Sequence, residues 1–542
     1  MIHDLLFQMC IFFNGSQSLK ILYMLFGFLV LPDVLGAQTY NIKDFGAVGD
    51  GRTVCTLAIQ KTIDSCEASG GGTVLIPAGM FLSGTIQLFD NIDLHLQRGA
   101  VLEGSKKVSD YYLGVEKVGL IYTESANNVS ISGEGNIDGN GDAFMDLHKA
   151  KRIDSAGSAY TRQGGRFREV SSGLGDGPLV PLDRPNQMVI FSECKNVTIS
   201  GVTFSNSPFW TIHLADCDGV IVSQVRIWNN VMVPNNDGID FTSCSNVQMS
   251  DCDIRTGDDG IVTVGYSHHF DSPGFHNLRH TSENITITNC HIVSRSSAIR
   301  VGGWDQNDMQ NYTFTNIVID SSNRGIHLCV RDSGSIRNIL FSNISIHTRF
   351  FTGDWWGNGE PINIEAVRGK ENVSLGTVSG VKFSHIIAQG PSGILLYSSD
   401  ESEIEDVSFD DVAFTLTADP LDSVCGGNFD LRPVIDQKYA LFKHEIPAFY
   451  AYHVKDVRLR GVDIKWGDVG EKYFTNGIQF SDFRDIVIDG CTSAPAPHDK
   501  TDAAISLQDG RGYRVTNSFS PFRGEEFLSK RNVEANHPAA SR

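Results

Sequence analysis

Positive charge is scarce in this 542-residue chain. Its 44 Lys and Arg residues, against 64 Asp and Glu residues, leave a formal net charge of −20. Proteins that bind nucleic acid without sequence preference, or that dock on anionic membranes, depend on basic surfaces. The sequence therefore predicts neither kind of partner. Salt screens exposed charges beyond about 8–10 Å, so an anionic sugar chain could still bind in a locally basic groove.

Long apolar runs are also missing downstream of residue 38, where no stretch approaches the ~20 apolar residues that span a bilayer. We therefore expect no membrane insertion. Near the start, Lys20 precedes a shorter apolar run over residues 21–31, and Gly36 and Ala37 follow. This pattern is typical of a secretory signal peptide. The sequence predicts a signal peptide over residues 1–37 and a mature protein that is secreted or periplasmic.

The chain has no Cys-x-x-Cys motif, so a zinc site of that type has no support. Its 11 cysteines would first suggest disulfides in an exported protein. Their context favours another interpretation, because four of them lie in the same local phrase, at Cys194, Cys217, Cys244 and Cys290. We expect these to be small buried hydrophobic side chains at the corners of a repeat rather than disulfide partners.

A short phrase recurs along the chain, with a polar or glycine corner followed by alternating apolar positions. Examples are Asn-Val-Ser-Ile-Ser at 128, Asn-Val-Thr-Ile-Ser at 196, Asn-Val-Gln-Met-Ser at 246 and Asn-Ile-Thr-Ile-Thr at 284. Each copy is typical of a short half-buried strand, and spacings near 27 residues without intervening helices indicate a coil of parallel strands. The sequence predicts an all-β, right-handed parallel β-helix over residues 38–535. Some copies also read as glycosylation sites, but we favour structural asparagines at turns.

Three segments depart from the repeat. Residues 38–105 should form the N-terminal cap and first rungs, with a short capping helix over Thr56–Cys66, where Ile59, Ile63 and Cys66 have helical spacing. Residues 140–183 form a long insertion, which we expect to flank a groove. A second insertion, over 350–364, carries Trp355 and Trp356, which serve either local packing or sugar stacking.

Acidic residues gather where two adjacent rungs are expected. Asp237 lies in Pro-Asn-Asn-Asp-Gly, and Asp258 and Asp259 lie in Thr-Gly-Asp-Asp-Gly, about one rung later. Neighbouring parallel strands lie about 4.8 Å apart, so the three carboxyl groups should share one patch of surface, and at least one pKa should be raised. Glycoside hydrolysis needs a protonated acid beside an ionised base. Turn capping and calcium binding are the alternatives.

In these motifs the chain resembles the polygalacturonase family of glycoside hydrolases, family 28. The likeness extends to Tyr-Asn-Ile-Lys-Asp-Phe-Gly-Ala at 40 and Ser-Pro-Phe-Trp at 207. The resemblance implies an inverting hydrolase that needs no metal or other cofactor. Asp258 would be the general acid, Asp237 and Asp259 would activate water, and Asn235 would orient the cluster. The implied partner is a pectic polysaccharide or oligosaccharide, and a monomer is the default for this architecture.

Two motifs of that family are altered in this chain. Ser-Ser-Ala-Ile-Arg-Val at 296 replaces a Gly-His-Gly, and Arg-Gly-Ile-His-Leu-Cys at 324 replaces an Arg-Ile-Lys, so that His327 and Cys329 take the basic positions. Arg300, Arg324 and His327 could rebuild a cationic patch that binds substrate. Arginines at rung corners are also commonly just solvated.

Three functions fit these observations. The leading one is hydrolysis of a pectic glycan other than plain homogalacturonan, such as rhamnogalacturonan or a decorated galacturonide. The second is a calcium-dependent polysaccharide lyase or epimerase on the same scaffold. The third is a glycan-binding solenoid without catalysis. The sequence does not decide between endo and exo attack, although the 140–183 insertion would favour exo attack if it closed one end of the groove.

Overall fold

The computed structural model describes residues 38–170, 172–267, 278, 280–497, 502–522 and 526–535. The contacts divide the chain into residues 1–39 and residues 40–542. The predicted signal peptide over 1–37 lies outside the described residues. No helix within the described ranges has the length and apolar character needed to cross a membrane.

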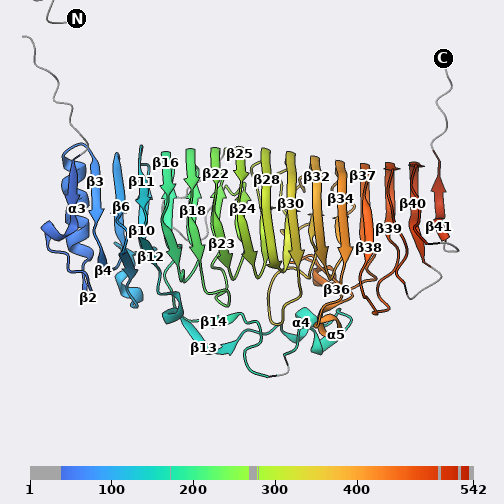
Figure 1. Cartoon of the computed structure of the whole chain (residues 1–542), viewed down its shortest axis with the longest axis horizontal. Coiled ribbons are helices and arrows are strands. Elements are labelled where there is room, and N and C mark those ends of the chain that lie inside the picture. Colours follow the sequence, from blue (N-terminus) through green and yellow to red (C-terminus); the bar gives the residue numbers. More distant parts are fainter. Residues whose placement is uncertain are drawn as a thin grey trace, which may run out of the picture. The chain divides into compact units, whose positions relative to one another are not determined.

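From residue 40 on, the described residues form a right-handed parallel β-helix, which confirms the predicted fold class. Most described strands belong to one 35-stranded sheet that winds around the coil, and Figure 1 shows the rungs side by side in sequence order. The rungs present three faces, which we call the first, second and third sheets.

The first sheet carries the candidate site. Its strands pair in parallel, each with the next, and their bounds are β5 (Ile86–Leu88), β10 (Ile121–Glu124), β15 (Val189–Ser192), β18 (Ile212–Ala215), β21 (Ile239–Thr242), β24 (Ile261–Val264), β27 (Ser297–Gly303), β29 (Arg324–Val330), β31 (Ile362–Ala366) and β33 (Ile394–Ser398).

The second and third sheets complete each rung. The second contains β3 (Gly72–Ile76), β6 (Ile92–Leu96), β11 (Ser130–Gly133), β16 (Lys195–Ser200), β19 (Asp218–Ser223), β22 (Ser245–Ser250) and β25 (Ser282–Thr288). The third contains β2 (Asp50–Val54), β4 (Gly79–Ser83), β7 (Ala100–Gly104), β12 (Asn136–Asp138), β17 (Thr203–Ser205), β20 (Arg226–Trp228), β23 (Asp253–Thr256), β26 (His291–Ser294) and β38 (Asp463–Trp466).

Later strands are longer, because they run through a corner without a break. They are β28 (Met309–Ser322), β30 (Ile336–Thr348), β32 (Val378–Gly390), β34 (Ile404–Leu416), β37 (Phe449–Arg460), β39 (Ile478–Asp489), β40 (Ala503–Thr516) and β41 (Glu526–Glu534).

Short elements lie outside these ladders or lead into them. The strands are β1 (Thr39–Asn41), β8 (Tyr112–Leu113), β9 (Glu116–Lys117), β13 (Met145–Ala150), β14 (Leu179–Pro181), β35 (Asn428–Asp430) and β36 (Leu441–Lys443). The helices are η1 (Ile42–Phe45), α3 (Thr56–Ala68), η2 (Val108–Asp110), η3 (Gly141–Phe144), α4 (Ser155–Ser158), η4 (Gly164–Arg166), α5 (Asp422–Cys425) and α6 (Gln437–Ala440).

The predicted capping helix is α3, which lies at the first rungs of the coil (Figure 1). It buries Ile59, Ile63 and Cys66, as their spacing predicts, and Thr62 beside them. The helix therefore shields the apolar interior of the first rungs from water.

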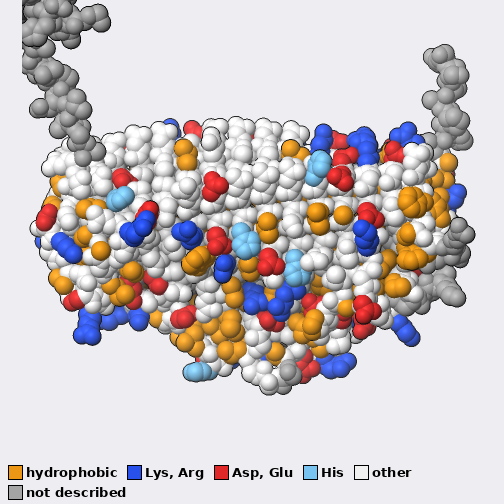
Figure 2. Space-filling view, viewed as in Figure 1, with side chains coloured by type: hydrophobic (Ala, Val, Ile, Leu, Met, Phe, Trp, Pro, Cys, Tyr) orange, Lys and Arg blue, Asp and Glu red, His pale blue; other side chains and the backbone are white. Residues whose placement is uncertain are grey.

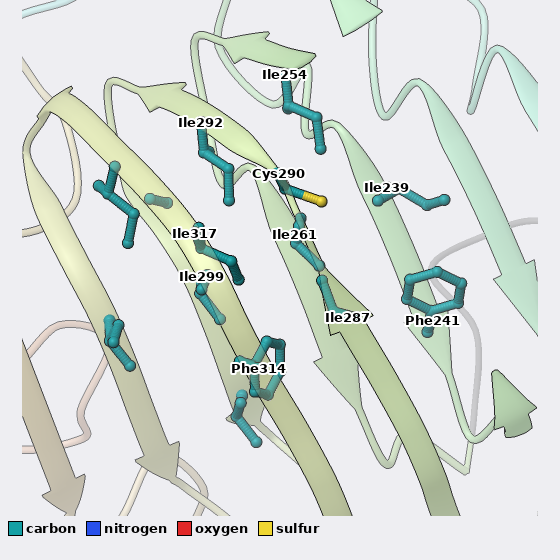
Figure 3. Packing of buried hydrophobic residues seen from close by; sticks show 14 of the residues in the cluster. Ile239, Phe241, Ile254, Ile261, Ile287, Cys290, Ile292, Ile299, Phe314 and Ile317 are labelled. Carbon is teal, nitrogen blue, oxygen red and sulfur yellow. The ribbon is translucent and has the colours of Figure 1, made fainter. Parts of the chain in front are cut away.

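Side chains that point into the coil stack on their counterparts in adjacent rungs. Figure 3 shows this for inward-pointing residues such as Ile239, Ile261 and Ile299, which are register partners on β21, β24 and β27. A second row consists of stacked phenylalanine rings. The distance between ring centroids is 4.8 Å for Phe314 and Phe341 and 5.0 Å for Phe341 and Phe383. The sequence repeat thus becomes a continuous apolar core.

Polar rows mark the corners. The asparagines of the repeated phrase adopt left-handed backbone angles, and their side-chain amides bond from rung to rung, for example from Asn311 to Asn284 at 3.4 Å and from Asn196 to Asn128 at 3.2 Å. These contacts support the structural interpretation of the repeated asparagines. The ten cysteines within the described residues are free and buried, and these include Cys194, Cys217, Cys244 and Cys290, for which the repeat predicted this.

The two insertions and the segment after β34 pack together into what we call the side lobe, residues 140–183, 350–361 and 419–445. Figure 1 shows β13, β14, α4 and α5 together beside one edge of the rungs. Buried Arg168 binds Trp355 O, Gly357 O and Asn358 Oδ1, and lies 3.5 Å from the carboxylate of Asp430. Figure 2, in the same view, shows Lys and Arg side chains gathered where the strands meet the lobe.

The stacked rings provide the first test of this packing. Phe341→Ala should destabilise the protein by about 3–5 kcal/mol, because it leaves a cavity between two buried rungs. The shift of the urea unfolding midpoint measures this. Leu340→Ala, on the same strand but 37% exposed, is the matched control and should shift the midpoint far less. Equal shifts would contradict the inward stacking.

Candidate active site

A pocket of about 290 Å³ opens on the first sheet beside the side lobe. Its lining includes all seven residues that the sequence put forward, which are Asn235, Asp237, Asp258, Asp259, Arg300, Arg324 and His327. The aromatic residues Phe209, Trp210, Tyr266, Trp304 and Trp356 line the same pocket, and the lobe contributes Arg432 and Pro433. The coil therefore brings several rungs and the lobe to one cavity.

Strand register places the three carboxyl groups. β21 pairs with β24 so that Ile239 faces Ile261, which sets Asp237 beside Asp259 on the next rung. One oxygen atom from each of Asp237, Asp258 and Asp259 lies within 4.8 Å of the others. Glycine is required between these turns, because a Cβ at Gly238 would lie only 2.3 Å from the carbonyl oxygen of Gly260.

Asp259 is held as a carboxylate. Burial alone would raise its pKa, but the pKa is lowered because Arg300 lies 3.1 Å away and two donors bind the other oxygen. These donors are Ser296 Oγ at 2.7 Å and the backbone N–H of Ser297 at 2.8 Å. The next rung thus supplies all three groups that stabilise the negative charge.

For Asp258, the groups that raise the pKa outweigh those that lower it. Burial and the neighbouring charge of Asp259 raise its pKa to about 7. The backbone N–H of Asn235, the charge of Arg300 and the backbone N–H of Asp259 oppose this shift. Asn235 donates to Asp258 Oδ2 from its backbone N at 3.1 Å, and its Nδ2 lies 3.3 Å from the same oxygen. Asp258 therefore carries a proton under mildly acidic conditions.

Asp237 shares the acidic environment. Burial, and then the charge of Asp258, raise its pKa, and its Oδ1 has no hydrogen-bond partner within the described residues. Three carboxyl groups this close cannot all ionise, so they titrate as one coupled set. Of the three, Asp259 is the one whose surroundings favour the anion at neutral pH.

The model of the glycosyl hydrolases family 28 matches residues 66–425 of the chain. The chain belongs to family 28. The match covers every rung that contributes to the pocket, which agrees with the resemblance of the acidic motifs.

Relatives and solved structures point the same way. A probable polygalacturonase of Vitis vinifera is 28% identical over 244 residues, 42% of this chain and 44% of that protein. An exo-poly-alpha-D-galacturonosidase of Dickeya chrysanthemi is 30% identical over 253 residues, 41% of each. The chain thus matches less than half the length of either relative. The family 28 exopolygalacturonase of Yersinia enterocolitica superposes with a TM-score of 0.61 at 19% identity, over 83% of this chain and 78% of that one, which shows a shared fold.

Among the basic residues of this family 28 chain, Arg300 is fully engaged. Its Nη1 binds Asp259, its Nη2 donates to Tyr266 Oη at 2.9 Å, and its Nε donates to Gly302 O at 2.9 Å. Its positive charge therefore stabilises the carboxylate of Asp259.

Arg324 and His327 are likewise matched by acids. Arg324 pairs with Glu360 at 3.2 Å, donates to Asp430 O and lies 3.3 Å from His327 Nδ1. His327 Nε2 is 3.7 Å from Glu365, a residue that also pairs with Arg324 at 3.6 Å. The structure brings the predicted basic residues together, and it surrounds them with buried carboxylates.

Several pocket residues had no signal in the sequence. Arg432 comes from a distant segment and pairs with Asp430 at 2.8 Å and Asp354 at 2.9 Å while its guanidinium lies 5.1 Å from the ring centre of Trp356. Of the paired tryptophans, Trp355 is buried in the lobe and Trp356 is 36% exposed at the pocket. Trp355 therefore serves local packing, and Trp356 lines the pocket.

A larger cleft of about 1060 Å³ lies on the third sheet, lined by residues such as Arg98, Arg226, Asp253 and His291. It holds no group of buried acids comparable to the three in the pocket. The smaller pocket is therefore the candidate site.

The raised pKa of Asp258 predicts a pH-dependent stability. A carboxyl group whose pKa is higher in the folded than in the unfolded state stabilises the fold at low pH, and that contribution is lost as the pH rises toward about 7. Asp258→Asn should therefore raise the free energy of unfolding at pH 8 by on the order of 1–4 kcal/mol, and change it little at pH 4. Urea titrations at both pH values measure this. Asp218→Asn, at an exposed rung position, is the control, and equal gains in both variants would contradict the assignment.

Proposed function

We propose that this chain hydrolyses glycosidic bonds in a pectic polysaccharide or oligosaccharide. Asp258 donates a proton to the leaving oxygen. Asp259, the carboxylate of the three, takes the proton of the attacking water, and Asp237 helps to position that water. The observation that carries the proposal is the divided protonation of one cluster, in which the pKa of Asp258 rises to about 7 while that of Asp259 is lowered. Hydrolysis of a glycosidic bond needs this pair of states. Membership of family 28 supports the assignment.

The stereochemical outcome that we propose is inversion, and it rests on the family. The compact cluster alone argues otherwise, because inverting enzymes commonly separate acid and base by about 6.5–9.5 Å, whereas the nearest oxygens of these three groups lie within 4.8 Å of one another. The anomeric form of the first product is therefore the deciding measurement.

The substrate that we propose is a pectic glycan other than plain homogalacturonan, such as a rhamnogalacturonan. A galacturonate carboxylate is best held by an unpaired guanidinium or ammonium group. In this pocket Arg300, Arg324, Arg331 and Arg432 each pair with a carboxylate of the chain. Tryptophan rings line the same space and suit the apolar faces of uncharged sugars.

Attack from a chain end is the mode that we propose. The lobe crosses the first sheet beyond the pocket, where Arg331 donates to Leu431 O at 3.0 Å and Ile435 N donates to Arg368 O at 3.1 Å. The 140–183 insertion supports this segment, since Arg162 N donates to Asn428 Oδ1 at 2.7 Å. These contacts join the lobe to the rungs next to the pocket, which supports attack at a chain end over attack within a long glycan.

A calcium-dependent lyase is the second candidate, because the three aspartates are grouped closely enough to hold an ion. Calcium takes six to eight oxygen ligands, and a cation near the site opposes its binding. Arg300 lies 3.1 Å from Asp259, and the charge of Arg184 acts on both Asp258 and Asp237. The electrostatics therefore favour hydrolysis. Binding without turnover would leave the raised pKa of Asp258 without a role.

The first functional test measures products from homogalacturonan, rhamnogalacturonan and side-chain oligosaccharides. We expect new reducing ends, no unsaturated product absorbing in the ultraviolet, no effect of chelator, and an inverted anomer by proton NMR. Asp258→Asn should lose roughly 10²–10⁴-fold in kcat, because the leaving group is no longer protonated. Asp218→Asn is the control. Chelator-sensitive ultraviolet absorbance, or full activity of Asp258→Asn, would overturn the proposal.

The second functional test addresses the substrate. We expect rhamnogalacturonan oligosaccharides to be cleaved faster than homogalacturonan oligosaccharides of equal length, with one short product accumulating from the start. Chemical reduction of the uronate in the terminal position should leave kcat/KM within a few-fold, because no unpaired cation of the pocket awaits its carboxylate. Faster cleavage of homogalacturonan with a strong loss on reduction would instead show that the arginines exchange partners for substrate.

A further inference from the structure

Arg184 lies directly after the 140–183 insertion and at the edge of the carboxylate cluster. Its Nη1 donates to Pro208 O at 2.9 Å and to Pro234 O at 2.8 Å, two carbonyls in the turns that precede β18 and β21. Its guanidinium also lies 4.6 Å from the ring centre of Phe209, which lines the pocket. One side chain thus ties two successive rungs together beside the site.

The third partner of Arg184 is Asn235. Nη2 of Arg184 donates to Asn235 Oδ1 at 2.9 Å. This bond fixes the amide so that Nδ2 points to the other side, where it lies 3.3 Å from Asp258 Oδ2. A flipped amide would set its oxygen against the carboxyl oxygen of Asp258. Arg184 therefore determines that the amide nitrogen of Asn235, and not its oxygen, lies beside Asp258.

The charge of Arg184 also remains available to the cluster. Its hydrogen bonds go to uncharged oxygens, and within the described residues it forms no ion pair. The pocket arginines Arg300, Arg324 and Arg432, by contrast, each pair with a carboxylate. Burial lowers the pKa of Arg184 to about 10, against the attraction of Asp258 and Asp237, so it stays a cation at the pH of activity.

We propose that Arg184 is a positioning residue for the reaction, which acts through Asn235 to orient Asp258 and stabilises the carboxylate that remains after proton donation. The inference rests on the proposed function of Asp258 as the acid. A cation near that carboxyl group favours its ionised form, and the Arg184–Asn235 contact keeps Asp258 aimed at the leaving oxygen.

Two substitutions separate charge from geometry. Arg184→Met removes both and should lower kcat by on the order of ten- to a hundredfold. It should also move the alkaline limb of the pH profile of kcat/KM, where activity falls as Asp258 loses its proton, to higher pH. The reason is that the pKa of Asp258 rises without the cation. Arg184→Lys retains the charge, so its limb should stay near that of wild type while kcat falls. Arg255→Met, which removes an arginine stacked 5.4 Å from the ring centre of Trp228 away from the pocket, is the matched control and should change neither.

A double-mutant cycle with Asn235→Ala tests the relay. If part of its action runs through Asn235, Arg184→Met should cost less in the Asn235→Ala background, where only the effect of its charge remains, so the two losses in kcat do not fully multiply. Losses that multiply, or an unmoved alkaline limb in Arg184→Met, would overturn the inference. The limb must be interpreted with every charged group that acts on the cluster, namely Asp237, Asp240, Asp258, Asp259, Arg184, Arg300 and His327.

A readout without turnover keeps this inference separate from the proposed function. If wild type cleaves no pectic fraction, the proposed function fails, and the pH dependence of unfolding still reports on Arg184. In wild type, stability falls as the pH rises toward the pKa of Asp258. In Arg184→Met that fall should move to higher pH, and an unchanged profile would count against any action of Arg184 on Asp258.

Discussion

Stacking in register is the constraint on which this structure depends. Parallel rungs place each side chain about 4.8 Å from its counterpart, so one type of residue repeats along a row. Inside the coil this stacks Phe314, Phe341 and Phe383, and at a corner it stacks amides. At the pocket the same rule forces Asp237 beside Asp259. The geometry that gives the core its regularity therefore also brings like charges together, which adds to burial in raising the pKa of Asp237.

Buried arginines and acids hold the lobe to the coil. Arg168, Arg324 and Arg432 converge on Asp430 and its neighbours, with pairs of 2.8–3.5 Å. Such pairs are costly to desolvate and favour one arrangement over others, because removing one partner strands a buried charge. The network fixes the lobe over the first sheet. It also neutralises the arginines that would otherwise give the pocket a strongly basic character.

The β-helix and the acidic cluster could be predicted from the sequence, since both arise from local repetition. The corner asparagines, the spacing of Ile59, Ile63 and Cys66 in the cap, and the one-rung separation of Asp237 and Asp259 are all visible in short windows. Arg184 and Arg432 were not visible in this way. Their roles depend on where the 140–183 and 419–445 segments fold back, and no periodicity encodes those contacts. For the same reason Arg324 was identified as a pocket residue, while its acidic partners Glu360 and Glu365 were not.

The free cysteines have a practical consequence. Ten thiols lie inside the described part of the chain, none is bridged, and sulfurs such as those of Cys194, Cys217 and Cys244 donate to carbonyls in the rungs. Within the described residues, cohesion between rungs therefore comes from ladder bonds, apolar stacking and polar side-chain contacts, without any covalent bridge. Over the described ranges no rung depends on a disulfide, so a reducing agent has no bond to break there.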